Sequence, residues 1–200
     1  MKKAAVAGGV AVMAAAVTAI VLVVVIIACA ILGINSYNGF VQKEEAVKSA
    51  QSAISVQLQR RADLIPNFVE TVKGYSDYEQ SALTAVIEAR SKVAAATNAE
   101  EQATAGAQLD SAIDIWVNAV TEAYPELKAD AQYIALQDEL AGTENRIAVA
   151  RKDYNDAASE YNKSIRKFPG NIIAGIFGFQ QVEYFEADQS ANNVPQVDFD

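Results

Sequence analysis

The amino-acid sequence predicts an all-α protein in which an N-terminal transmembrane helix precedes a helical bundle and a short C-terminal helix. An apolar run from Ala4 to Ile34 contains no charged residue, and beyond it apolar residues recur at heptad-like intervals. Strand-like alternation of useful length is not found anywhere in the sequence. We therefore divide the chain into a transmembrane anchor at 1–35, a helical bundle at 36–186, and an acidic tail at 187–200 that we expect to be disordered.

The anchor is the clearest prediction. A bilayer core of about 30 Å needs about 20 apolar residues in a helix, so residues 4–34 are long enough to cross the lipid bilayer once. Lys2 and Lys3 flank one end, and Lys43 and Lys48 follow the other, so the positive-inside rule leaves the side of the bundle open.

The residues around Cys29 loosely resemble a lipoprotein cleavage box, and the sequence leaves lipidation of Cys29 open. Because the apolar run continues to Ile34, we favour an uncleaved anchor. Small residues at Gly8, Ala11 and Ala15 suit close approach of two membrane helices, although an Ala-rich segment without a partner explains them too.

Composition excludes several functions. The net charge of −9 disfavours nucleic acid as a partner. The chain has no histidine, so it lacks the commonest metal ligand and the usual general base at neutral pH. We therefore expect no cofactor, no metal and no catalytic residue. A hydrolase built on paired carboxylates, or a metalloprotein, is the third class of function that we consider.

Four helical stretches follow the anchor. The first carries apolar residues from Phe40 to Ile65, and Pro66 then either kinks it or starts a new helix that Asp63 caps. A second reaches Ala96 and is followed by a turn at 97–101. There Asn98 should cap the start of the next helix, and the side chain of Glu101, three residues on, should bond back to the turn. The third should bury Leu109, Ile113, Trp116, Val120 and Tyr124.

Pro125 should end the third helix and open a fourth, which we expect to run from Glu126 to Phe168. Its stripe from Ile147 to Phe168 keeps a strict rhythm of four and three residues, which predicts antiparallel or coiled-coil packing. Pro169 and Gly170 should then break the helix.

Five charged residues project onto the apolar faces of these helices. They are Arg61, Glu79, Arg90, Glu144 and Arg151. Because buried charges are tolerated only when paired, we predict that they form interhelical ion pairs, with a functional pocket as the alternative. On this interpretation Glu79→Ala should destabilise the soluble domain by several kcal/mol, about the loss expected when a buried partner is stranded.

Several motifs closely resemble the LemA family of bacterial membrane-anchored helical proteins, including its magnetosome-membrane members. The resemblance spans about residues 36–186, and its motifs include QLQRRADLIPNFVETVKGYSDYE at 57–79, GTENRIAVARKDYNDA at 142–157, FPGNIIA at 168–174 and YFE at 184–186. It implies an elongated up-and-down four-helix bundle, a cytoplasmic domain and no catalytic residues. The family-signature positions are Arg60, Arg61, Asp63, Pro66, Asn67, Glu70, Glu79, Arg90, Glu144, Asn145, Arg146, Arg151, Tyr154 and Asn155.

The resemblance has modest departures. Phe68 stands where the family more often has Leu, Tyr78 where it commonly has His, and Gly170 where Ser is usual. The Tyr78 difference argues against histidine-dependent chemistry in this chain.

The apolar segment 171–186 is a possible docking element through Ile176, Phe177 and Phe179. It either packs across the end of the bundle or lies on a membrane or partner surface. From the whole sequence we expect a single-pass scaffold or adaptor in a bacterial membrane that recruits other membrane proteins. The alternative is a membrane-shaping or envelope-stress component that assembles as a homo-oligomer.

Overall fold

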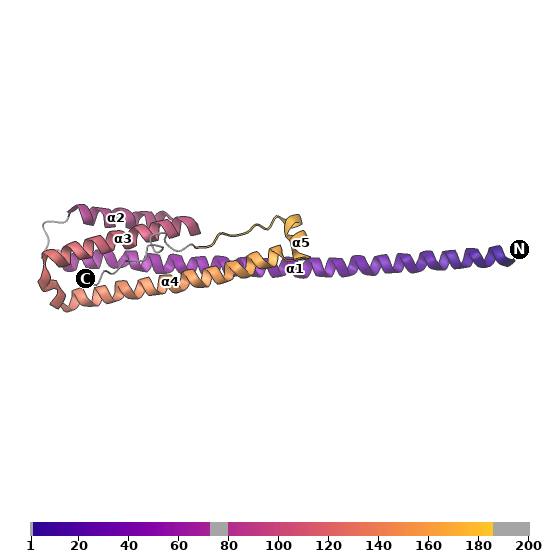
Figure 1. Cartoon of the computed structure of the whole chain (residues 1–200), viewed down its shortest axis with the longest axis horizontal. Helices are drawn as coiled ribbons and strands as arrows, with labels where there is room; N and C mark the ends of the chain where they lie inside the picture. Colours follow the sequence, from indigo (N-terminus) through magenta and orange to yellow (C-terminus); the bar gives the residue numbers. More distant parts are fainter. Residues whose placement is uncertain (1, 73–79, 186–200) are drawn as a thin grey trace, which may run out of the picture. The chain divides into compact units, whose positions relative to one another are not determined.

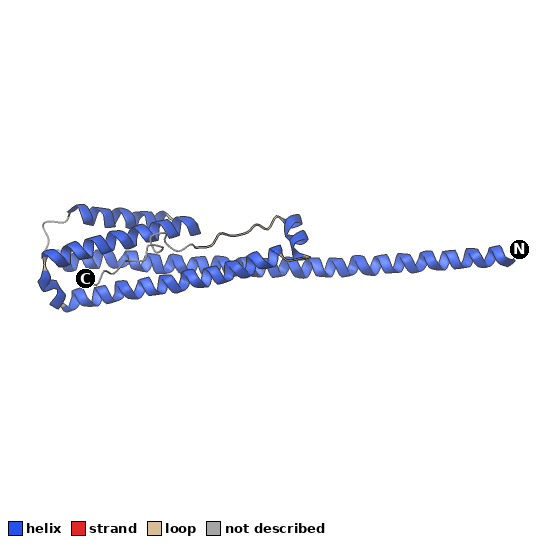
Figure 2. Cartoon of the chain, viewed as in Figure 1, coloured by secondary structure: helices blue, strands red, loops and turns tan. Residues whose placement is uncertain are grey.

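The computed structural model describes residues 2–72 and 80–185, with side chains described for residues 17–72 and 82–185. Every regular element in these ranges is helical, which confirms the all-α prediction (Figures 1 and 2). The elements are α1 (Lys2–Val72), α2 (Gln80–Ala95), α3 (Ala99–Ala123), the 3-10 helix η1 (Pro125–Ala129), α4 (Ala131–Arg166) and α5 (Gly170–Phe177). The predicted acidic tail at 187–200 lies outside the described residues.

The chain divides into two compact units. The first comprises Met1–Glu44 and Tyr161–Gln181, and the second comprises Glu45–Glu160 and Val182–Asp200. The first unit thus holds the apolar start of α1 together with α5, whereas the second holds the helical bundle.

The apolar part of α1 is exposed. Among the described helices, α1 alone is long and apolar enough to cross a membrane, and none of its most apolar window is buried within the protein. Val24 and Ile27 have exposed fractions of 59% and 54%. This exposure distinguishes the segment from the buried core helix of a soluble protein.

Pro66 lies inside α1 and does not start a new helix. Asp63 is therefore not a cap, and its Oδ1 instead accepts a hydrogen bond of 2.8 Å from Gln59 Nε2. Ile65 and Phe68 on either side of Pro66 are almost fully buried. Because this packing fixes both flanks, the apolar stripe outweighs the helix-breaking tendency of proline.

The predicted turn before α3 is confirmed. Asn98 accepts a hydrogen bond of 2.9 Å from the backbone N–H of Glu101, and the N–H of Thr97 donates to Glu101 Oε2 at 2.7 Å. The bond from the Thr97 N–H, together with a bond of 3.0 Å from Thr97 Oγ1, holds the pKa of the Glu101 carboxyl below its ordinary value. The α3 stripe is buried as predicted through Val120, whereas Tyr124 is half-buried.

The start of the last long helix was predicted five residues too early. Pro125 opens the short helix η1, and α4 begins at Ala131. Asp130 Oδ1 accepts from the backbone N–H groups of Gln132 and Tyr133, both at 2.9 Å. Leu127 is fully buried within η1, so this connection packs into the core.

The core of the second unit is built on aromatic rings. Phe68 of α1 packs edge-on against Trp116 of α3, with 5.0 Å between ring centroids, and in a tilted arrangement against Tyr133 of α4, with 5.2 Å between ring centroids. The other fully or nearly fully buried apolar side chains follow the predicted helical spacing: Ile54, Leu58, Ile65, Val72, Val86, Leu109, Ile113, Val120, Leu140, Ile147 and Ala158. These contacts join α1, α3 and α4 in one core.

In the first unit α5 packs across α1. Phe179 lies 5.5 Å from Tyr37 and 5.3 Å from Phe40 between ring centroids, and Phe177 lies 4.9 Å from Tyr37. Gly178 ends α5 in the left-handed conformation, with φ of 77°.

Phe168 was predicted to extend the buried stripe of α4, but its side chain is 81% exposed. The reason is that α4 ends at Arg166, and the segment through Pro169 turns away from the helix before that side chain can pack.

Candidate functional site

Arg61 lies at the centre of a polar cluster in the second unit. Its side chain is only 2% exposed, and its Nε lies 2.9 Å from Asp110 Oδ1 on α3. Its Nη1 donates a hydrogen bond of 3.0 Å to the backbone carbonyl of Leu140 on α4. One guanidinium therefore joins three helices.

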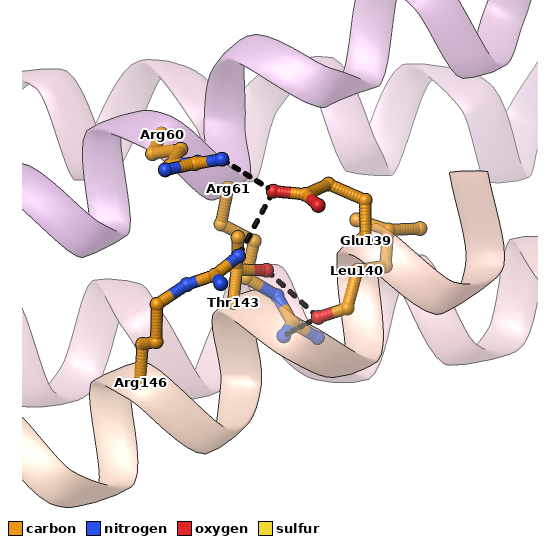
Figure 3. Close-up of polar contacts among 6 residues, drawn as sticks. All are labelled: Arg60, Arg61, Glu139, Leu140, Thr143 and Arg146. Atoms are coloured by element: carbon orange, nitrogen blue, oxygen red, sulfur yellow. Dashed lines mark hydrogen bonds and ion pairs between the residues drawn. The ribbon is translucent and has the colours of Figure 1, made fainter. Parts of the chain in front are cut away.

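The Leu140 carbonyl accepts a second bond. Thr143, whose side chain is fully buried, donates from Oγ1 to the same oxygen at 2.7 Å. Figure 3 shows Arg61 and Thr143 converging on this carbonyl from different helices. Since buried polar groups need partners, this carbonyl anchors the arginine to the α4 backbone.

Asp110 is a member of this cluster that the sequence reasoning missed. Burial raises its pKa above the ordinary value of 3.8, while the charges of Arg61 and Arg151 pull it down. Desolvation is the larger effect, so the carboxyl of Asp110 is harder to ionise than in water. Asp110 lies four residues after Gly106 and three before Ile113, on the buried face of α3. Its helical spacing therefore gives the same signal that identified the five charged residues on apolar faces.

The five predicted charges have different environments. Arg61 is buried as expected, but Glu144, whose Oε2 lies 3.8 Å from Arg61 Nη1, is 66% exposed. Arg90 is 44% exposed and lies 3.7 Å from Asp63 Oδ1, so it is not a buried charge either. Helical projection gives the direction of a side chain but not its distance from the helix axis, and long side chains at the edge of a stripe reach water. Glu79 lies outside the described residues.

Arg151 packs where α3 has no side chain. A Cβ at Gly106 would lie 2.9 Å from Arg151 Nη2 and 3.0 Å from Leu58 Cδ2. Gly106 therefore makes room for the guanidinium between α1, α3 and α4. The Nε and Nη2 atoms of Arg151 are buried without a hydrogen-bond partner.

A second, more exposed cluster lies on the neighbouring face. Arg60 Nη2 and Arg146 Nη2 lie 2.7 Å and 2.9 Å from the same oxygen, Glu139 Oε1 (Figure 3). Both arginines are among the predicted signature positions. Because these side chains are at least about a third exposed, the network ties α1 to α4 only weakly.

Two further signature residues hold an extended segment against α4. Asn155 Nδ2 donates to the carbonyl of Phe185 at 2.9 Å, and the N–H of Phe185 donates to Asn155 Oδ1 at 2.8 Å. Tyr154 donates to the carbonyl of Glu183 at 3.0 Å, and its ring packs at right angles to Phe185. We call residues 182–185 the C-terminal strap.

The remaining signature residues lie on the surface. Asn67, Glu70 and Asn145 are exposed, as are Pro66 and Asp63 of α1. Asp63 and Asn67 line one surface groove together with Arg60.

The clusters are suited to fixing helices more than to chemistry. A surface groove is lined by Asp110, Glu144, Arg151 and Phe185. The carboxylates of Asp110 and Glu144 both lie near the guanidinium of Arg61. The described residues contain no group of three His, Cys, Asp or Glu side chains placed to hold a metal ion. What the arrangement provides is an ionic and hydrogen-bonded cross-link among α1, α3 and α4.

Comparison with known proteins gives consistent relatives. The chain is 29% identical over 186 residues to the magnetosome protein MamQ 2 of Paramagnetospirillum magneticum, covering 80% of this chain and 68% of that protein. It is 26% identical over 166 residues to the protein LemA of Metamycoplasma hominis, covering 82% and 73%. It is 27% identical over 193 residues to the magnetosome protein MamQ of Magnetospirillum gryphiswaldense, covering 80% and 68%.

The model of the LemA family matches residues 50–199. That range holds α2, α3, α4, α5 and both arginine clusters. The chain therefore belongs to the LemA family.

Proposed function

We propose that this protein is a membrane-anchored helical scaffold that recruits or organises other membrane proteins, and that it has no catalytic activity. The observation that carries the proposal is the exposed apolar part of α1, which continues as the same helix to Val72. An exposed apolar surface of this length marks a site of contact with a membrane or a protein. Two relatives are named as magnetosome proteins, which supports a role in an assembly.

The anchor is tested by placing charges in it. Val24→Lys with Ile27→Lys should move the protein from the carbonate-resistant membrane fraction toward the soluble fraction, because a lysine near the bilayer centre costs about 2.5–3.5 kcal/mol. The matched control is Ile115→Lys with Val149→Lys, which changes residues of similar exposure on the bundle. Equal retention of both double variants would contradict the anchor.

The scaffold role is tested by crosslinking in intact cells. A photoreactive amino acid at the exposed positions Ile115 and Val149 should give adducts with other membrane proteins, identified by mass spectrometry. A ladder of the chain with itself would instead favour a self-assembling, membrane-shaping component. The absence of crosslinks both to other membrane proteins and to a second copy of the chain would contradict both roles.

A further inference from the structure

The short helix α5 leaves most of its large apolar side chains uncovered. Ile172, Ile176 and Phe177 are 53%, 69% and 58% exposed, and Phe168 just before the helix is 81% exposed. Ala174 is the buried residue of α5, at 4% exposure. The face of α5 that holds Ala174 and the ring of Phe177 packs against α1, whereas Ile172 and Ile176 lie on its exposed, apolar side.

The contacts of α5 place it at the end of the apolar run. A Cβ at Gly33 would lie 3.7 Å from Ile173 Cδ1, and Gly33 is the residue before the last apolar residue of the run. Tyr37 then packs on Phe177 and Phe179. If residues 4–34 cross a bilayer, α5 lies where hydrocarbon gives way to headgroups, the level at which tyrosine is enriched.

The charge around α5 differs from that of the rest of the chain. Between Tyr161 and Gln181 the sequence contains Lys163, Arg166 and Lys167 and no acidic residue, although the whole chain has a net charge of −9. All three basic side chains are exposed. Basic residues beside an exposed apolar helix are the pattern of a segment that lies in an anionic membrane interface.

We infer that α5 is an interfacial helix, which inserts Ile172 and Ile176 among the acyl chains while Lys163, Arg166 and Lys167 contact anionic headgroups. The inference rests on the proposed anchor. It gives the first unit a second attachment to the bilayer, beside the anchor.

The test uses the full chain in vesicles of phosphatidylcholine with a minor share of phosphatidylglycerol. A spin label is attached through Ile176→Cys in a Cys29→Ser background, and collisions with oxygen, which concentrates in hydrocarbon, are compared with collisions with a water-soluble nickel complex. The expected oxygen-to-nickel ratio at position 176 lies several-fold above that of the matched control, Ile115→Cys with Cys29→Ser. Ile115 is 61% exposed and lies beside Asp114.

A label on the native Cys29 reads the anchor separately. The ratio there should be the highest of the three positions, and access of nickel to Cys29 would overturn the anchor and with it the interfacial position of α5. A deep Cys29 with position 176 as open to nickel as position 115 would overturn the α5 inference alone. Protection of position 176 from both reagents would mean that protein covers it, which also overturns the inference.

A separate experiment tests the three basic residues. Adding phosphatidylglycerol to pure phosphatidylcholine vesicles should raise the ratio at position 176, and replacing Lys163, Arg166 and Lys167 by Gln should remove that rise. A ratio that is insensitive to the anionic lipid would show that these residues do not contact headgroups. Circular dichroism of each labelled protein shows whether the helices are intact.

Discussion

Arg60 and Arg61 are neighbours in α1 with opposite environments. The Arg61 side chain is 2% exposed and ion-paired with Asp110, whereas Arg60 is 55% exposed and pairs with Glu139. A guanidinium without access to water depends on its protein partners, but one at the surface exchanges them for solvent. The two arginines therefore contribute very differently to stability.

We expect Arg61→Met to lower the free energy of unfolding by about 1–3 kcal/mol, because it removes the charged partner of the half-buried Asp110 carboxyl. Arg60→Met should lower it by less than about 1 kcal/mol. Urea unfolding followed by circular dichroism, with the full chain in detergent micelles, measures both. The double variant Arg61→Met with Asp110→Leu should recover part of the loss, and equal losses in the two single variants would contradict the buried pair.

Asp110 should make stability depend on pH. Its pKa is raised in the folded state, so the folded protein binds this proton more readily than the unfolded chain. The resulting stabilisation is complete below 3.8 and is lost as the pH rises through the raised pKa. The unfolding free energy of the native protein, relative to that of Asp110→Asn, should therefore increase on acidification. A difference independent of pH would contradict the raised pKa.

The sequence predicted only part of this cluster. It identified Arg61 because the spacing from Ile54 and Leu58 places that residue on the apolar face. It did not show that Glu144 reaches solvent, since periodicity does not report how far a long side chain extends. Nor could it find the Leu140 carbonyl, because a backbone acceptor leaves no signal in the sequence.

At the scale of single elements, local rules worked where a side chain bonds its own turn. Asn98 and Glu101 lie three residues apart, and Asn98 caps the N–H of Glu101 as predicted, while the Glu101 carboxylate accepts from the N–H of Thr97, one residue before the cap. Local rules did not decide between a kink and a new helix at Pro66, and after Pro125 they placed the start of the last long helix five residues too early. Burial around Pro66 holds the helix together, whereas Pro125 takes the first position of η1, where no amide donor is needed.

This contrast predicts opposite responses to one substitution. Pro66→Ala should raise the free energy of unfolding by up to about 3 kcal/mol, because it restores an intrahelical hydrogen bond and removes a steric clash. Pro125→Ala, the matched control, should give no such gain. Thermal unfolding of both variants in the same detergent measures the difference, and a Pro66→Ala protein less stable than the native one would argue for a helix start at Pro66.

At the scale of the whole molecule, the C-terminal strap makes a non-local attachment in the bundle. The backbone of Phe185 is held by both ends of the Asn155 amide, thirty residues away in sequence. Phe185 itself is 7% exposed. The helical periodicity predicts the bundle but not this strap, because an extended segment of four residues has too short a pattern to recognise.

We expect Asn155→Ala to release the strap and to lower the free energy of unfolding by about 1–3 kcal/mol, since it leaves two backbone groups of Phe185 without partners. Amide hydrogen exchange at residues 182–185 should accelerate before the helices do. Asn145→Ala changes an exposed amide of the same helix and serves as the control. An unchanged rate of amide hydrogen exchange at Phe185 would contradict the proposed role of Asn155 in holding the C-terminal strap.

The packing of Trp116 has a practical consequence. It is the single tryptophan of the chain, it is 2% exposed, and it packs against Phe68 next to the proline of α1. Its intrinsic fluorescence therefore reports on the α1–α3 contact without a contribution from the apolar segment at residues 4–34. A red shift of the Trp116 emission maximum would mark water entering the contact between α1 and α3. The fluorescence of the purified protein in lipid vesicles therefore reports on this contact alone.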